Sequence, residues 1–198
     1  MNRRVIFPPT DYWTQPKETT MTENPNRDKA GDFRRAALLT KYRRQGNQAA
    51  QVVIVEEVNE TNRAAELLHA LLVLHMVFFV RFRTPDAANM LADYFAGIAS
   101  LEPIDAETTD TIRAAQIINH HGHHNRQAIV QVMNAATLDG RATQTILAVL
   151  DHYEVALPEL SATAGIAFIE ANATAMLEQE YRSDDRDDET PTGGGLPS

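Results

Sequence analysis

Apolar residues in the middle of the chain recur with the spacing of an α-helix. Steps of three, four or seven positions join Ile54, Val58, Ala65, Leu68, Leu72, Met76 and Phe79. This spacing places their side chains on one helical face. Residues 51–58 are also rich in β-branched side chains and fit a strand by local propensity. The longer period favours a helix over residues 47–83, with an interruption near residues 59–62.

Residues that begin and end helices separate the apolar runs. Short polar side chains able to cap a first turn lie at Asp32, Thr84, Asp105, Asn125 and Thr143. Helix ends are expected near Gly46, Gly97, Gly122 and Gly140. Pro158 separates the last two helices. Because helix breakers would not have this spacing in a sheet protein, the sequence predicts an all-α fold, a compact bundle of about six to seven helices.

A single helical domain over residues 32–181 accounts for these elements. Residues 1–31 contain four prolines and no sustained apolar period, and residues 182–198 are acidic and rich in glycine. Neither segment can bury enough apolar surface to fold, so we expect disordered N- and C-terminal tails. Met21 opens the string MTENP, which is typical of a natural start, so residues 1–20 are expected to be an over-long gene assignment.

The most apolar stretch, residues 67–80, is interpreted as a buried helix. It has fourteen residues and includes His69 and His75, whereas a membrane span needs about 20 apolar residues. Near the N-terminus, Pro8, Pro9 and Asp11 interrupt the apolar run that a secretory signal requires. We therefore expect a cytoplasmic protein that does not contact a membrane.

The composition excludes several kinds of chemistry. The 198 residues include no cysteine, which excludes disulfides, cysteine-ligated zinc, iron–sulfur clusters and thiol nucleophiles. No glycine-rich phosphate-binding motif and no nucleophile-elbow serine is present. The sequence therefore indicates no catalytic and no cofactor-binding residue.

The formal net charge of −9 is unevenly distributed. Residues 1–50 hold ten Lys and Arg against five Asp and Glu, and residues 51–180 hold six against seventeen. Because an acidic body repels nucleic acid, such a contact would have to use the basic segment, residues 33–44. Its cations are Arg34, Arg35, Lys41, Arg43 and Arg44. They scatter around the helical wheel, so the alternatives are a solvated helix face or a surface that holds the acidic body or tail of another copy.

Four of the seven histidines lie in the string NHHGHHN, residues 119–125. On a continuous helix, His120 and His124 would be close enough to share a divalent ion such as Zn²⁺. Gly122 instead favours a corner between two helices. The metal hypothesis takes as ligands His120, His121, His123 and His124, with Asp110 or Asp151 supplied by folding. The alternatives are a polar, hydrated helix junction and a pH sensor.

Glu66 and His69 form one Glu-x-x-His motif. Carboxylate-bridged di-metal bundles use two such motifs, and no other histidine here follows a glutamate by three positions. We therefore expect His69 and His75 at the edge of the core, each hydrogen-bonded to a neighbour.

The preferred functional hypothesis is a non-enzymatic α-helical protein-interaction protein with an accessory, assembly or regulatory role. It would bind a protein partner or another copy of itself, and tails of this kind commonly recruit partners. One alternative is a nucleic-acid-associated regulator that uses residues 33–44, with residues 139–153 as part of a helix-turn-helix. The other is a metal-binding protein that uses the histidine cluster.

Overall fold

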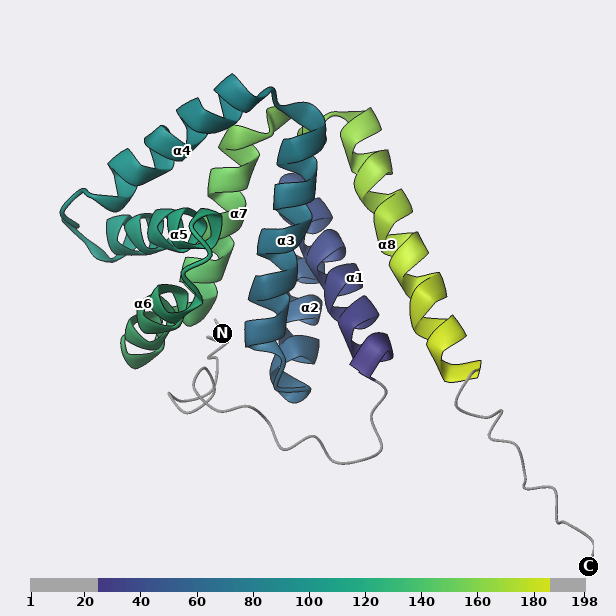
Figure 1. The fold of residues 1–198 in the computed structure, drawn as a ribbon. Helices are drawn as coiled ribbons and strands as arrows, with labels where there is room; N and C mark the ends of the chain where they lie inside the picture. Colours follow the sequence, from purple (N-terminus) through teal and green to yellow (C-terminus); the bar gives the residue numbers. More distant parts are fainter. Residues whose placement is uncertain (1–24, 186–198) are drawn as a thin grey trace, which may run out of the picture.

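The computed structural model describes residues 25–185, with side chains over residues 28–180. This part of the chain contains eight α-helices, one 3₁₀ helix and no strand (Figure 1). The helices are α1 (Pro25–Arg44), α2 (Gln48–Glu60), α3 (Ala64–Phe82), α4 (Pro85–Ala99), α5 (Ala106–Gly122), α6 (Arg126–Leu138), α7 (Ala142–Ala156) and α8 (Thr163–Asp185), with the 3₁₀ helix η2 (Pro158–Ser161) before α8. The predicted all-α fold is confirmed, with one helix more than the expected upper number.

Local capping chemistry sets several of these boundaries as expected. The Thr84 hydroxyl accepts a hydrogen bond from the amide of Ala87, and Pro85 occupies the first turn of α4. Asp105 begins α5 through a capping box with Thr108. Gly46 ends α1 with a φ of +64°, a left-handed conformation that glycine adopts without strain.

Other boundaries differ from the prediction. Helix α1 begins at Pro25 rather than at Asp32, which lies buried inside the helix and caps nothing. Helix α8 continues to Asp185, past the expected end at residue 181. Helix α7 begins at Ala142, one position before the expected start at Thr143. The remaining parts of the expected tails, residues 1–24 with Met21 and residues 186–198, lie outside the described residues.

The long apolar run of residues 47–83 is divided into two helices. Helices α2 and α3 are separated by a short turn in which Asn62 has a φ of +59°. The interruption expected near residues 59–62 is therefore confirmed, and residues 51–58 are helical rather than extended.

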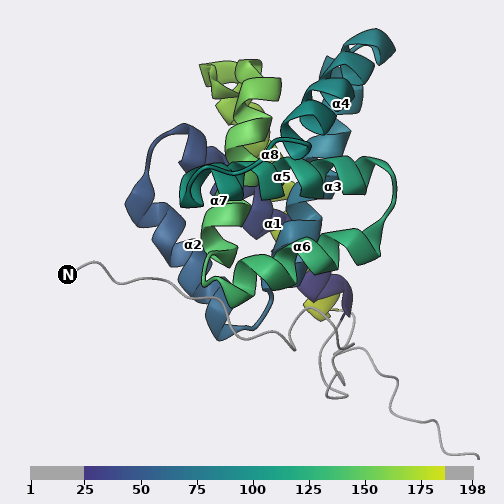
Figure 2. The same cartoon turned by 90° about the vertical axis from the view of Figure 1, so that its left-hand side faces the viewer.

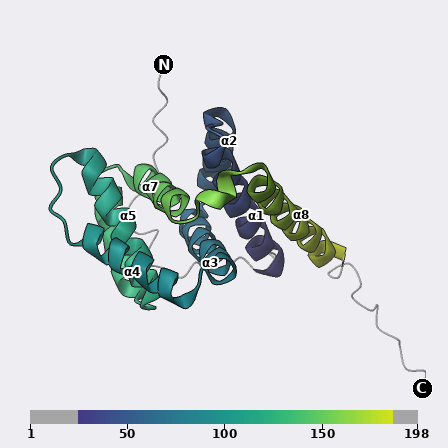
Figure 3. The same cartoon turned by 90° about the horizontal axis from the view of Figure 1, so that it is seen from above.

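Helix α1 lies between α3 and α8, with α2 across its end (Figures 1 and 3). Helices α1 and α8 lie side by side although they are the first and last helices of the described chain. Helix α5 packs against α4, α6 and α7, and α7 also contacts α1, which joins the two groups of helices (Figure 2). Long side chains that are fully buried include Leu39, Leu67, Leu71, Phe78, Ile117, Ile146 and Ile169.

Helix α3 is the one described helix with the length and apolar composition to cross a membrane. However, 44% of its most apolar stretch is buried inside the fold, and the fully buried His75 lies within it. Nine residues of α3 are buried, so the bundle itself uses part of the apolar surface of this helix.

Candidate functional site

The histidine-rich string forms the corner between α5 and α6. Helix α5 ends at Gly122, and the His123 ring donates a hydrogen bond from Nδ1 to the carbonyl of Asn119 at 2.9 Å. His124 has a φ of +55°, which turns the chain before Asn125 caps α6 through the amide of Ala128. The corner expected at Gly122 is therefore present. The residue of this corner whose backbone is left-handed is His124.

The corner directs its histidines to different surfaces. His121 and His124 line a cavity beside α3, whereas His123 lines a separate groove between α3 and α4. Within residues 28–180, no three histidine, aspartate or glutamate side chains gather in a position to hold a metal ion. The two carboxylates considered as further ligands are engaged elsewhere: Asp110 binds Arg141, and Asp151 binds Arg43.

The two histidines of α3 differ from each other. His75 is fully buried, with Nδ1 2.8 Å from the carbonyl of Leu71 and its ring stacked on Tyr153 at 4.1 Å between centroids. Burial lowers its pKa to about 3. His75 therefore lies inside the core rather than at its expected edge, whereas His69 lines the cavity beside α3 and keeps part of its side chain exposed. The predicted hydrogen bond is confirmed for His75.

The basic segment is bonded to acidic side chains of the same chain. Arg34 pairs with Glu180 of α8 at 3.0 Å, Lys41 pairs with Glu170 of α8, and Arg43 binds Asp151 of α7 through two hydrogen bonds of 2.7 Å. Arg44 donates to the carbonyl oxygens of Tyr153 and Leu157. A phosphate would have to displace these partners.

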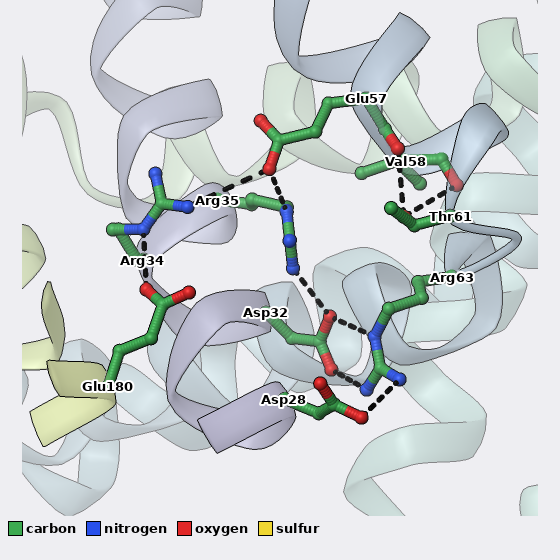
Figure 4. Close-up of polar contacts among 9 residues, drawn as sticks. All are labelled: Asp28, Asp32, Arg34, Arg35, Glu57, Val58, Thr61, Arg63 and Glu180. Atoms are coloured by element: carbon green, nitrogen blue, oxygen red, sulfur yellow. Dashed lines mark hydrogen bonds and ion pairs between the residues drawn. The ribbon is translucent and has the colours of Figure 1, made fainter. Parts of the chain in front are cut away.

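Arg35 belongs to a buried network at the start of the bundle (Figure 4). It donates to Glu57 of α2 at 2.8 Å and pairs with Asp32 at 3.2 Å. Arg63 also binds Asp32. Its guanidinium donates two hydrogen bonds, of 2.8 and 2.5 Å, to the two carboxylate oxygens of Asp32. The network ties α1, α2 and the turn before α3 together.

An apolar groove, here called the α3–α4 groove, lies on the described surface between α3 and α4. It was not predicted from the sequence. It encloses about 420 Å³ between α3, α4 and the end of α5. Its apolar lining includes Met76, Phe79, Val80, Pro85, Ala88, Leu91, Ala92, Phe95 and Ile118. The exposed fraction of Val80 is 76%. The sequence carried one signal, since the apolar residues of α3 cover more than the single face that a surface helix buries.

An ion pair supports one end of this groove. Arg83 follows α3 and donates to both carboxylate oxygens of Glu159 at 2.5 and 2.9 Å, and to the carbonyl of Ala156. The guanidinium lowers the pKa of Glu159. Because Arg83 also lines the groove, this contact holds the α3–α4 turn against the segment after α7.

The fold and its surface define an all-α bundle that carries an apolar α3–α4 groove. No family model matches this sequence, and comparison with curated proteins and with solved structures found no match.

Proposed function

We propose that this chain is a non-enzymatic protein-interaction protein with an accessory, assembly or regulatory role in the cytoplasm. The observation that supports the proposal is the α3–α4 groove, which is mainly apolar and leaves Val80 76% exposed. Contiguous exposed apolar surface is uncommon on monomeric soluble proteins and is typical of sites where another polypeptide packs.

The proposed occupant is a second copy of this chain. The groove offers a partner an almost uncharged surface, because Arg83 is the only Asp, Glu, Lys or Arg among its lining residues and is already paired with Glu159. An interface between identical copies uses the same patch twice, so an apolar patch of this kind is complementary to itself.

Replacing Val80 with glutamate should weaken this self-association at least about tenfold, because the interface would bury an unpaired carboxylate. The matched control is Val155→Glu, which introduces the same charge at an apolar residue that is 64% exposed on α7. Size-exclusion chromatography with light scattering over a range of concentrations measures both. We expect dimers for the wild type and Val155→Glu, and monomers for Val80→Glu. A wild-type chain that stays monomeric at about 100 μM, or equal behaviour of both variants, would overturn the proposal.

The two alternatives have less support. All five cations of the basic segment have bonding partners within the chain. Nine residues of α7, the helix within the expected helix-turn-helix segment, are buried, so this helix has little free face to place in a DNA groove. The histidines of the corner line two different cavities.

A further inference from the structure

A second cavity, here called the basic pocket, lies beside the N-terminal half of α3. It encloses about 300 Å³ between α3, the histidine corner and the start of α6. One part of its wall is apolar and consists of Ala65, Leu68, Leu72, Ile129 and Val130. The remaining lining residues are His69, His121, His124 and Arg126. The basic pocket thus combines an apolar wall with four nitrogen-bearing side chains, and no carboxylate is among the residues that line it.

The positive charge of the basic pocket is not compensated within the described chain. Most arginines over residues 28–180 pair with a carboxylate, as Arg34, Arg63 and Arg141 do. Arg126 is exposed and has no ion pair or side-chain hydrogen bond to a described residue. The charge of Arg126 acts on His69, together with that of Lys29 from α1. Uncompensated cations on an acidic protein attract an anion to this place.

The histidines of the basic pocket are crowded and partly desolvated. Burial lowers the pKa of His69, and Arg126 and Lys29 lower it further. Burial also lowers the pKa of His121, with added repulsion from His69 and His124. Nδ1 of His121 is buried without a hydrogen-bond partner among the described residues. A neutral ring avoids burying an unpaired N–H by carrying its proton on Nε2, which leaves that nitrogen as a donor.

We propose that the basic pocket binds a small organic anion that has a carboxylate head and a short apolar body. Arg126 and the imidazole N–H groups bind the carboxylate, because charge-assisted hydrogen bonds to such an anion are the strongest that these side chains make. The apolar wall, which includes Leu68, Leu72 and Ile129, packs against the body of the ligand. A volume of about 300 Å³ is at the lower end for small-molecule sites, so the ligand is small.

Titration calorimetry with three probes tests the two halves of this site. Hexanoate carries both the carboxylate and the apolar body, inorganic phosphate carries charge alone, and hexan-1-ol carries the apolar body alone. We expect saturable binding of hexanoate to the full chain, about tenfold tighter than binding of either partial probe. Phosphate or hexan-1-ol binding as tightly as hexanoate would overturn the proposal, as would no hexanoate binding at millimolar concentration.

Two variants locate the binding. Arg126→Gln should weaken hexanoate binding about tenfold and leave hexan-1-ol binding unchanged. Arg81→Gln is the matched control, because it removes the same charge from an exposed arginine at the far end of α3 and should leave hexanoate binding unchanged. Ala65→Leu fills the basic pocket and should abolish hexanoate binding. Thermal unfolding of this variant checks that it is still folded. Hexanoate binding that is equal in all three variants would overturn the proposal.

Discussion

Replacing Asp32 with alanine is expected to lower the free energy of unfolding by about 3–5 kcal/mol. Asp32 is 4% exposed, and its carboxylate receives hydrogen bonds from Arg35 and from Nε and Nη2 of Arg63. Its loss leaves two largely desolvated guanidinium groups without this partner. Removing one member of a buried ion pair costs far more than the pair contributes, because the remaining charge stays buried.

Asp151→Ala is the matched control for this prediction. Asp151 also binds an arginine through two hydrogen bonds, but its side chain is 50% exposed. Water can replace the lost carboxylate there, so we expect a change of about 0–1 kcal/mol. Urea unfolding followed by circular dichroism measures both variants. If Asp32→Ala costs no more than Asp151→Ala, the Asp32 network does not stabilise the fold in the way that its geometry indicates.

Acidification from pH 7 to pH 4.5 is expected to remove about 2.5 kcal/mol of stability through His75 alone. Burial lowers the pKa of His75 to about 3, whereas an unfolded histidine keeps its ordinary value of about 6.5. Above pH 6.5 the ring is neutral in both states and contributes no pH dependence. Between 6.5 and 3 the unfolded chain takes up a proton that the folded chain does not, so stability falls as the pH falls.

The variant His75→Leu should flatten this pH dependence by about 2.5 kcal/mol over the same interval. Phe78→Leu is the control, because it changes a neighbouring buried ring of α3 and adds no titrating group. It should lower stability by a similar amount at both pH values. Urea unfolding at pH 7 and at pH 4.5 gives the comparison. An unchanged pH dependence in His75→Leu would show that other groups, such as the buried His152 with its lowered pKa, cause the acid sensitivity.

The helices themselves could be predicted from the sequence because their signals are local. Thr84 with Pro85, Asp105 with Thr108, and Asn125 satisfy the free amides of a first turn within a few residues. Such contacts form in the same way whatever the rest of the fold does. A boundary that was wrong, the start of α1, involves a residue with a distant partner, Asp32.

Asp32 illustrates how a local signal can mislead. Its residue type is typical of a cap, but its partner Arg63 lies 31 positions later in the chain. Only the packing of α1 beside the turn before α3 brings the two together. The local signal that could have marked the earlier start is Pro25, since proline is common in the first turn of a helix.

The sequence identified individual candidate residues, but it did not show which of them lie together in the folded protein. The string around Gly122 indicated a corner, but the corner sends His121 and His124 to the basic pocket and His123 to the α3–α4 groove. Arg126 was not singled out, because one arginine at the start of a helix has no distinctive spacing. Its importance follows from His69, which lies far from it in the chain and near it in the structure.

The sequence by itself determined the helical fold class, most helix boundaries and the absence of cysteine chemistry, because these depend on residue type and on neighbours within a turn. The tertiary structure alone decided which charges are paired, which histidines share a cavity and which apolar residues of α3 stay exposed. These properties depend on contacts between residues that are far apart in the chain. The cations of α1 are the clearest case, since carboxylates of α2, α7 and α8 reach them when the bundle forms.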